Sequence, residues 1–269
     1  MKKFITFIFL FVFGILTENN YSQYTLIFSS DLIPWADTVL VYLPDNYADE
    51  LKYPATFMLH GWTGNFMAWG IIANLRYYSN IYTMIIITPN GFYDSWYLNS
   101  PTAKNYQYET YFYTVLYPEI LKKYSIDSSN VFITGLSMGG HGAMSLFLKK
   151  PELFKAAGST SGILDLTKFP SRYSIRARLG EYETNKNFWR NNSCYYLLDN
   201  IKGTNKEIIF DCGTEDFAYE VNKNFYEKCL KLKIKATFIS RPGKHDRKHW
   251  KRAAEDHLYF FYRMAYNFD

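Results

Sequence analysis

The chain has 269 residues, of which 48% are hydrophobic and 20% are charged, and its formal net charge is +5. So small an excess of basic residues does not indicate a nucleic-acid-binding protein. A chain of this length can bury an adequate core without a disulfide framework. It shows no linker, repeat or low-complexity block, so we expect one domain over residues 23–269.

The first 22 residues have the pattern of a secretory signal peptide. Lys2 and Lys3 precede an apolar run over residues 4–16, and polar residues follow. A basic start, a short apolar segment and a polar end are typical of such peptides, whereas a transmembrane helix needs roughly 20 apolar residues. We therefore expect cleavage near Ser22 and Gln23, a secreted or periplasmic protein, and no stable membrane insertion after cleavage. An N-terminal membrane anchor is the alternative.

Short apolar or β-branched runs alternate with helix-like segments along the rest of the chain. We predict strands at residues 38–42, 55–59, 83–88, 131–134, 156–159, 207–211 and 236–239. We predict helices at residues 108–124, 141–150, 218–232 and 249–265. The alternation indicates an α/β fold with a mainly parallel central sheet and helices on both faces, with residues 24–28 and 38–42 at an antiparallel edge. Residues 164–203 lack clear periodicity and are expected either to border a functional site or to form a plain surface excursion.

Three cysteines, Cys194, Cys212 and Cys229, lie in the region that we expect to be exported. An odd number leaves at least one thiol without an intramolecular partner. One disulfide is compatible with the sequence, although the spacing does not say which pair would form it. None of the spacings is typical of a zinc site.

The G-x-S-x-G motif at residues 135–139 predicts a nucleophilic serine. A predicted strand leads into Ser137 and a helical pattern follows it, which is the context that this motif needs. Glycines suit Gly135 and Gly139 because side chains there would collide with the backbone of so sharp a turn. A glycine-rich structural turn is the alternative. We predict that Ser137 is the nucleophile of an α/β-hydrolase fold, in which an acid and then a histidine follow the serine.

The base is expected among the histidines after Ser137, because a serine hydroxyl is a weak nucleophile until an imidazole takes its proton. His245 follows the last predicted strand, where an α/β sheet collects reactive groups. His249 is its rival, whereas His141 and His257 fall in predicted helices. The pair His245 and His249 also has the i,i+4 spacing of a zinc site. That interpretation lacks an acidic residue at the second position and a third ligand, so we expect no metal or cofactor.

Three carboxylates around a glycine turn are candidates for the acid that orients the base. Asp211 is expected within the strand at residues 207–211, whereas Glu215 and Asp216 come just after its end. We favour Asp216, with Glu215 as the second choice. The carboxylate that is not used would favour the dipole of the next helix.

The oxyanion of acyl transfer requires hydrogen-bond donors, usually the N–H after the nucleophile and another from the loop after an earlier strand. The first is the N–H of Met138. The loop at residues 60–65 follows the strand at residues 55–59 and presents the N–H of Trp62 as the second. For His60 we expect a structural hydrogen bond rather than proton transfer.

Taken in chain order, these motifs resemble the esterase D-like hydrolases, which include feruloyl and acetyl-xylan esterases, tributyrin esterases, S-formylglutathione hydrolases and the mycobacterial mycolyltransferases. The resemblance extends from about residue 38 to residue 262. The matching residues are Leu59-His60-Gly61 with Trp69, Trp96-Tyr97 with Ser100-Pro101, Tyr108-Glu109-Thr110, Gly135-Leu136-Ser137-Met138-Gly139-Gly140, Asp211-Cys212-Gly213-Thr214-Glu215-Asp216-Phe217, and Gly243-Lys244-His245 ending at Trp250.

The resemblance implies which residues form the site. It implies Ser137 as nucleophile, Asp216 as acid and His245 as base, with backbone donors at Trp62 and Met138. It separates His245 from His249, since the base of this family lies two residues after a glycine and five before a tryptophan. Two positions depart from the family pattern and bear on substrate choice: Arg247 stands where an aromatic residue is common, and Asn99 where an aspartate often precedes Ser-Pro.

Together these features predict a secreted serine carboxylic-ester hydrolase that works through an acyl-enzyme intermediate. The signal peptide disfavours the cytosolic S-formylglutathione role, and we expect acetyl or feruloyl esters of polysaccharides as substrates. A sugar or phenolic ring could stack on aromatic residues in the predicted loops, namely Trp62, Trp69, Phe92, Trp96 and Tyr97. The alternatives are acyl transfer to a sugar hydroxyl and a non-catalytic binding protein on the same fold.

Overall fold

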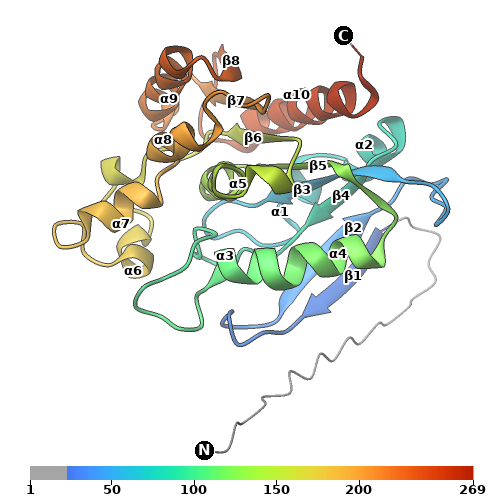
Figure 1. The fold of residues 1–269 in the computed structure, drawn as a ribbon, viewed down its shortest axis with the longest axis horizontal. Helices are drawn as coiled ribbons and strands as arrows, with labels where there is room; N and C mark the ends of the chain where they lie inside the picture. Colours follow the sequence, from blue (N-terminus) through green and yellow to red (C-terminus); the bar gives the residue numbers. More distant parts are fainter. Residues whose placement is uncertain (1–22, 269) are drawn as a thin grey trace, which may run out of the picture.

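A computed structural model describes residues 23–268, and its centre is an eight-stranded sheet in the order β1-β2-β4-β3-β5-β6-β7-β8 (Figure 1). The predicted signal peptide lies outside the described residues. The strands β1 and β2 pair antiparallel, as do β2 and β4, and the other neighbours are parallel. The predicted mainly parallel sheet with an antiparallel edge is therefore confirmed. The strands are β1 Gln23–Phe28, β2 Asp37–Tyr42, β3 Tyr53–Leu59, β4 Ile85–Thr88, β5 Ile126–Gly135, β6 Ala156–Thr160, β7 Glu207–Gly213 and β8 Lys235–Arg241.

Helices cover both faces of the sheet. One face packs against α1, α2 and α10, and the other against α3, α4, α5 and α9. The helices are α1 Ala68–Ile72, α2 Leu75–Ile81, α3 Tyr108–Tyr111, α4 Tyr117–Lys123, α5 Met138–Lys149, α6 Ile175–Leu179, α7 Lys186–Asn191, α8 Cys194–Leu197, α9 Tyr219–Leu232 and α10 Arg247–Tyr266. Short 3-10 turns lie at Pro151–Leu153, Leu166–Lys168 and Leu198–Ile201.

The apolar run of β4 reflects the position of this strand between two hydrophobic cores. Ile85 and Ile87 belong to the core on the side of α3 to α5, whereas Ile86 belongs to the core on the side of α1, α2 and α10. Successive side chains of a strand point to opposite faces, so a strand covered on both faces is a nearly continuous apolar run.

The helix predicted at residues 108–124 is not uniform. It consists of α3, a π-helical turn at Phe112–Leu116 and α4. Pro118 lies in the first turn of α4 and has no N–H to donate to the preceding turn, which accounts for a change in hydrogen-bond register there. The short helices α1 and α2 were not predicted, because five and seven residues are too few to show a helical period.

The segment between β6 and β7 holds the unpatterned residues 164–203. It forms α6, α7 and α8, of which α6 and α7 lie apart from the sheet on the left of Figure 1. Its end is held against α5, where Nε2 of His141 lies 2.8 Å from the carbonyl oxygen of Asn192. Its start reaches the functional site described below, so the expectation that it borders a site agrees with the structure.

All three cysteines are buried and free. Burial raises the pKa of the thiols of Cys194 and Cys212, and it raises the pKa of Cys229 to about 12. Because the thiolate is the reactive form, these side chains act as small packing residues, and the single disulfide that the sequence allowed does not form in the structure.

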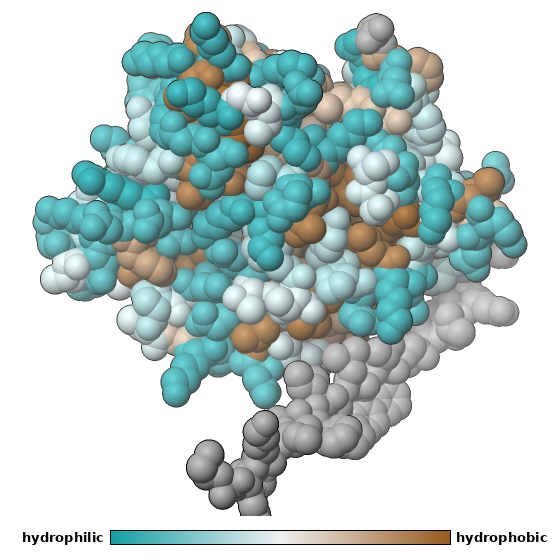
Figure 2. All heavy atoms as spheres, viewed as in Figure 1, coloured by the Kyte–Doolittle hydropathy of each residue, from teal (hydrophilic) through white to brown (hydrophobic). Residues whose placement is uncertain are grey.

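The surface of the described chain is mixed in polarity. Hydrophobic residues on the face drawn in Figure 2 form small patches between hydrophilic ones. Among residues 23–268 no helix combines the length and apolarity needed to cross a membrane.

Candidate active site

Ser137 lies on a strained turn between β5 and α5. Its backbone has φ 54° and ψ −116°, a conformation that costs free energy for any residue with a Cβ. The Ser137 N–H donates to the carbonyl of Thr160 in β6 at 2.9 Å, which ties the turn to the next strand. A Cβ at Gly139 would lie 2.2 Å from the carbonyl oxygen of Leu59, so only glycine fits there. The helix begins at Met138, three residues before the predicted start, because this turn leads straight into it.

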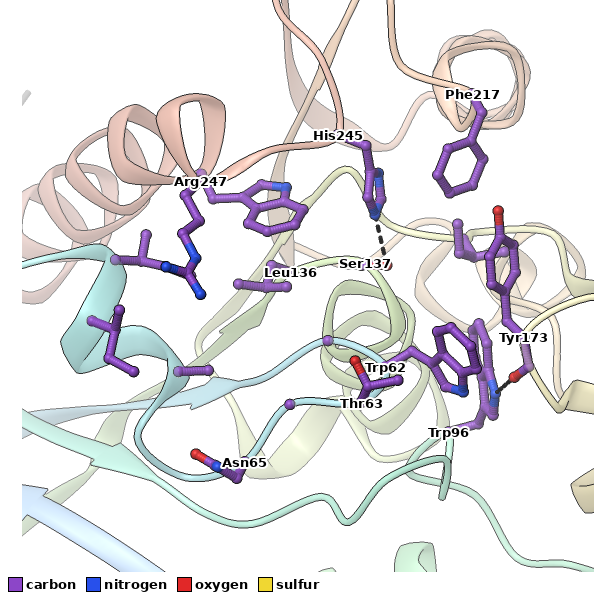
Figure 3. A pocket seen from close by; sticks show the side chains of 17 residues that line it. Trp62, Thr63, Asn65, Trp96, Leu136, Ser137, Tyr173, Phe217, His245 and Arg247 are labelled. Atoms are coloured by element: carbon purple, nitrogen blue, oxygen red, sulfur yellow. Dashed lines mark hydrogen bonds between the residues drawn. The ribbon is translucent and has the colours of Figure 1, made fainter.

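The structure brings the three predicted triad residues together. His245 Nε2 lies 3.0 Å from Ser137 Oγ, and His245 Nδ1 lies 2.9 Å from Asp216 Oδ2 and 3.0 Å from Oδ1 (Figure 3). His245 is in the loop between β8 and α10, and Asp216 follows β7, so both come from the carboxyl ends of parallel strands. This is the hydrogen-bonding order that nucleophilic catalysis by serine requires.

The environment of Asp216 favours its ionised form. Its side chain is fully buried, and Oδ1 also accepts a hydrogen bond from the N–H of Ala218 at 2.8 Å. Burial acts to raise the pKa of Asp216, but the hydrogen bond and charge of His245 and the Ala218 N–H outweigh it, so the pKa falls below its ordinary value. An ionised Asp216 can hold the proton of His245 on Nδ1 and leave Nε2 free to accept one from Ser137.

The rival residues have other partners. His249 Nε2 lies 2.6 Å from Asp211 Oδ1, and His257 Nε2 lies 2.9 Å from Asp211 Oδ2. Glu215 is more than half exposed, and its carboxylate lies 3.7 Å from Nζ of Lys244. His245 and His249 therefore contact different carboxylates. This arrangement differs from a zinc site, in which the two histidines would bind the same metal ion.

The two predicted oxyanion donors border the serine. Met138 supplies the first N–H of α5, and Trp62 lies in the loop after β3. Neither N–H donates to a carbonyl within the part of the chain that the structure describes. His60 holds this loop: Nε2 accepts the Gly91 N–H at 2.7 Å, and Nδ1 lies 2.8 Å from the carbonyl oxygen of Gly61. Burial lowers the pKa of His60 to about 4, so it stays neutral, in agreement with its predicted structural role.

A cavity of about 440 Å³ opens beside Ser137 and His245. Four aromatic side chains stand on one side of it (Figure 3), and we call them the aromatic wall: Trp62, Trp96, Tyr173 and Phe217. Ring centroids are 5.6 Å apart for Trp62 and Tyr173, 5.5 Å for Tyr173 and Phe217, and 4.5 Å for Phe217 and His245. Arg247 lies on the other side of the serine.

The loop aromatics predicted to stack on a ring divide into two groups. Trp62 lines the cavity, as expected, and Trp96 borders it although only 1% of its surface is exposed. Trp69, Phe92 and Tyr97 are buried in the two cores, and that expectation was wrong for them. Trp69 lies in α1, and its Nε1 donates to the carbonyl of Leu59 at 2.9 Å, so its ring supports β3 from within.

Sequence reasoning missed Tyr173 and Phe217 as cavity residues. Tyr173 lies in the unpatterned segment, where no periodicity could orient it. Phe217 had one signal, its position next to Asp216, because a neighbour of a residue that reaches the site from a tight loop lies near the same cavity.

The model of a protein family described as "Putative esterase" matches residues 30–260 of this chain. The chain belongs to this esterase family. The enzyme is a carboxylic ester hydrolase. The family predicted from its motifs is confirmed.

Relatives of the enzyme agree with this assignment. An acetyl esterase from Caldicellulosiruptor saccharolyticus is 25% identical over 257 residues, which cover 84% of the enzyme and 92% of the relative. The solved structure of a ferulic acid esterase is 25% identical with a TM-score of 0.76, and the match covers 90% of the enzyme and 97% of that chain. The solved structure of an S-formylglutathione hydrolase from Agrobacterium tumefaciens has a TM-score of 0.78 at 22% identity, and the match covers 93% of the enzyme and 98% of that chain. This last likeness concerns the fold alone, and the predicted α/β-hydrolase fold is confirmed.

Proposed function

We propose that the enzyme is an exported serine esterase with Ser137 as nucleophile, His245 as general base and acid, and Asp216 as the carboxylate that orients the base. The observation that carries the proposal is the chain of hydrogen bonds from Ser137 Oγ through His245 to the buried Asp216, at 3.0 Å and 2.9 Å. Ser137 and His245 line a cavity that can admit an ester.

The proposed reaction has two half-reactions. Ser137 Oγ attacks the ester carbonyl carbon while His245 Nε2 takes its proton, and the N–H groups of Trp62 and Met138 donate to the oxyanion. The C–O bond to the alcohol then breaks, and His245 returns the proton to the leaving alcohol. In the second half-reaction, water attacks the acyl carbon of the acyl-enzyme while His245 Nε2 takes a proton from the water. The bond from the acyl carbon to Ser137 Oγ then breaks, His245 returns the proton to Ser137 Oγ, and the carboxylic acid leaves.

We propose acetyl or feruloyl esters of polysaccharides as the substrate class. The aromatic wall supports this, since a phenolic or sugar ring stacks favourably on aromatic faces. The names of two relatives, acetyl esterase and ferulic acid esterase, point the same way. The signal-like residues 1–22 support action outside the cytoplasm.

The test compares the mature enzyme with Ser137→Ala and His245→Ala on para-nitrophenyl acetate, para-nitrophenyl butyrate, methyl ferulate and S-formylglutathione. We expect both variants to lose at least about a thousandfold in kcat while keeping the melting temperature of the wild type within a few degrees. Ser137→Ala with wild-type activity would overturn the mechanism. A preference for S-formylglutathione over every oxygen ester would overturn the substrate class.

Export is tested separately. The full chain is expressed with its N-terminus intact in a bacterial host, and the released protein is sequenced from its first residue. We expect a mature chain that begins near Gln23, whereas a protein retained in the cytoplasm with Met1 would contradict export.

A further inference from the structure

Arg247 brings a positive charge to the active-site cavity. It is the first residue of α10, and its guanidinium points into the cavity on the side opposite the aromatic wall (Figure 3). Its side chain is exposed, and it forms no ion pair with any carboxylate among residues 23–268. A guanidinium that faces a substrate cavity without a protein partner is free to bind an anion from the substrate.

The neighbouring carboxylates are engaged elsewhere. Asp246 caps α10, where its Oδ1 accepts the N–H of His249 at 2.9 Å, and the carboxylate of Glu215 lies near Lys244. The catalytic Asp216 is buried beneath His245. The field at this side of the cavity is therefore dominated by Arg247 and by the positive end of the 20-residue helix α10.

The basic surface continues away from Ser137 along the same helix. Lys251 lies four residues after Arg247, so both side chains project from one face of α10. Lys251 lines a second pocket that shares Ile71 and Ile72 with the active-site cavity. A substrate that extends past these two isoleucines would meet both cations in turn.

We propose that Arg247 is a specificity-determining residue that binds a carboxylate carried by the ester substrate. The inference rests on the proposed function, since it assumes that the ester reacts at Ser137. A planar guanidinium can bind a carboxylate through two parallel hydrogen bonds, and the substrate then lies between this anchor and the aromatic wall, with its ester carbonyl near Ser137. The carboxylate belongs either to the acyl part or to the alcohol part of the ester.

Two matched pairs of esters distinguish these sources. For the acyl part, the pair is para-nitrophenyl hydrogen adipate and para-nitrophenyl methyl adipate. For the alcohol part, the pair is the acetate of meta-hydroxybenzoate and the acetate of its methyl ester. Within each pair the substrates differ by one charge, so the ratio of their kcat/KM values measures the preference for a carboxylate.

The ratios are measured for the wild type, Arg247→Gln, Arg247→Lys and the matched control Lys248→Gln. Lys248 is the next residue of α10 and lies outside the active-site cavity, so its substitution removes the same charge without touching the substrate. We expect Arg247→Gln to lower the ratio of one pair by about tenfold or more, mainly through KM, because a hydrogen bond to a charged group contributes about that much. Arg247→Lys should recover part of the loss, and added salt should weaken the preference of the wild type.

Equal ratios in the wild type and Arg247→Gln for both pairs would overturn the proposal. An equal loss in Lys248→Gln would also overturn it, because a general field rather than a contact would then select the anion. Hydrolysis of all four esters by Ser137→Ala would instead overturn the proposed function. The two failures are thus distinguished by which variant shows them.

Discussion

The adjacent residues Glu215 and Asp216 show how strongly the surroundings decide the role of a side chain. The side chain of Asp216 is fully buried and accepts hydrogen bonds from His245 and from the backbone, whereas that of Glu215 is 57% exposed. A buried carboxylate can orient an imidazole and stabilise its charge, because water does not screen the interaction. An exposed carboxylate one residue away cannot replace it.

The substitution Asp216→Asn tests this difference. We expect kcat to fall by about 10³- to 10⁴-fold with a small change in KM, since an amide favours the wrong tautomer of His245. Glu215→Gln is the matched control and should change kcat by less than about twofold. Steady-state kinetics on para-nitrophenyl acetate measures both. The assignment of the acid would be contradicted if Glu215→Gln lost more activity than Asp216→Asn.

The segment between β6 and β7, which has no regular sequence pattern, contributes Tyr173 to the aromatic wall. Tyr173 in this segment accepts the Nε1–H of Trp96 through its carbonyl at 3.0 Å. Its ring stacks on Phe217, whose ring lies against His245. The segment between β6 and β7 is therefore joined to the loops of Asp216 and His245 through aromatic contacts, and under the proposed function its sequence would influence which acyl or alcohol group fits the cavity.

The substitution Tyr173→Ala tests the aromatic wall. We expect kcat/KM for methyl ferulate to fall about three- to tenfold more than kcat/KM for para-nitrophenyl acetate, since an aromatic pair contributes about 0.5–1.5 kcal/mol beyond area burial. Tyr196→Ala is the control, because Tyr196 is an exposed tyrosine in the same segment that does not line the cavity. Equal losses on the two esters would show that the wall does not select aromatic groups.

Asp37 is the first residue of β2, the strand through which the antiparallel edge joins the parallel sheet. Its Oδ1 accepts the N–H of Asn90 at 2.8 Å and its Oδ2 accepts the hydroxyl of Tyr111 at 2.9 Å. Burial raises the pKa of Asp37 to about 7 against these two hydrogen bonds, which lower it. The folded protein thus holds a proton at Asp37 that the unfolded chain loses near pH 4.

This raised pKa predicts a pH-dependent stability. Below about pH 4 both states are protonated and the contribution is fully present, and it is lost as pH rises toward 7, by up to about 4 kcal/mol. Asp37→Asn lacks this loss, so its free energy of unfolding should rise relative to the wild type between pH 5 and pH 8. Urea denaturation of both proteins at each pH measures the difference between their free energies of unfolding. Burial lowers the pKa values of His60 and His141 to about 4, so these histidines make stability rise with pH in both proteins. Taking the difference between the two proteins removes this shared contribution. A constant difference between the proteins would contradict the raised pKa.

The strands and longer helices of the α/β alternation, the sharp turn at Ser137 and the short set of candidate acids and bases could be predicted from the sequence, whereas the short helices α1, α2, α6, α7 and α8 could not. Each of the predicted features depends on local signals: apolar period, glycines beside a serine, and polar residues just after a strand. The same local signals favoured His245 and Asp216 but left His249 and Glu215 as rivals. The resemblance pointed to the same two residues, and the structure brings their side chains to Ser137.

Only the tertiary structure decided which residues enclose the cavity. Trp69 and Tyr97 lie in segments that the sequence marks as loops beside the site, yet they are buried in the cores, whereas Tyr173 comes from a segment without pattern and lines the cavity. The direction of a loop side chain depends on the space left by elements that are distant in the sequence. That space is defined only after the sheet, its helices and the segment between β6 and β7 have packed. Local sequence thus determined the sharp turn at Ser137 and the alternating architecture of this enzyme, and packing decided which side chains line the cavity.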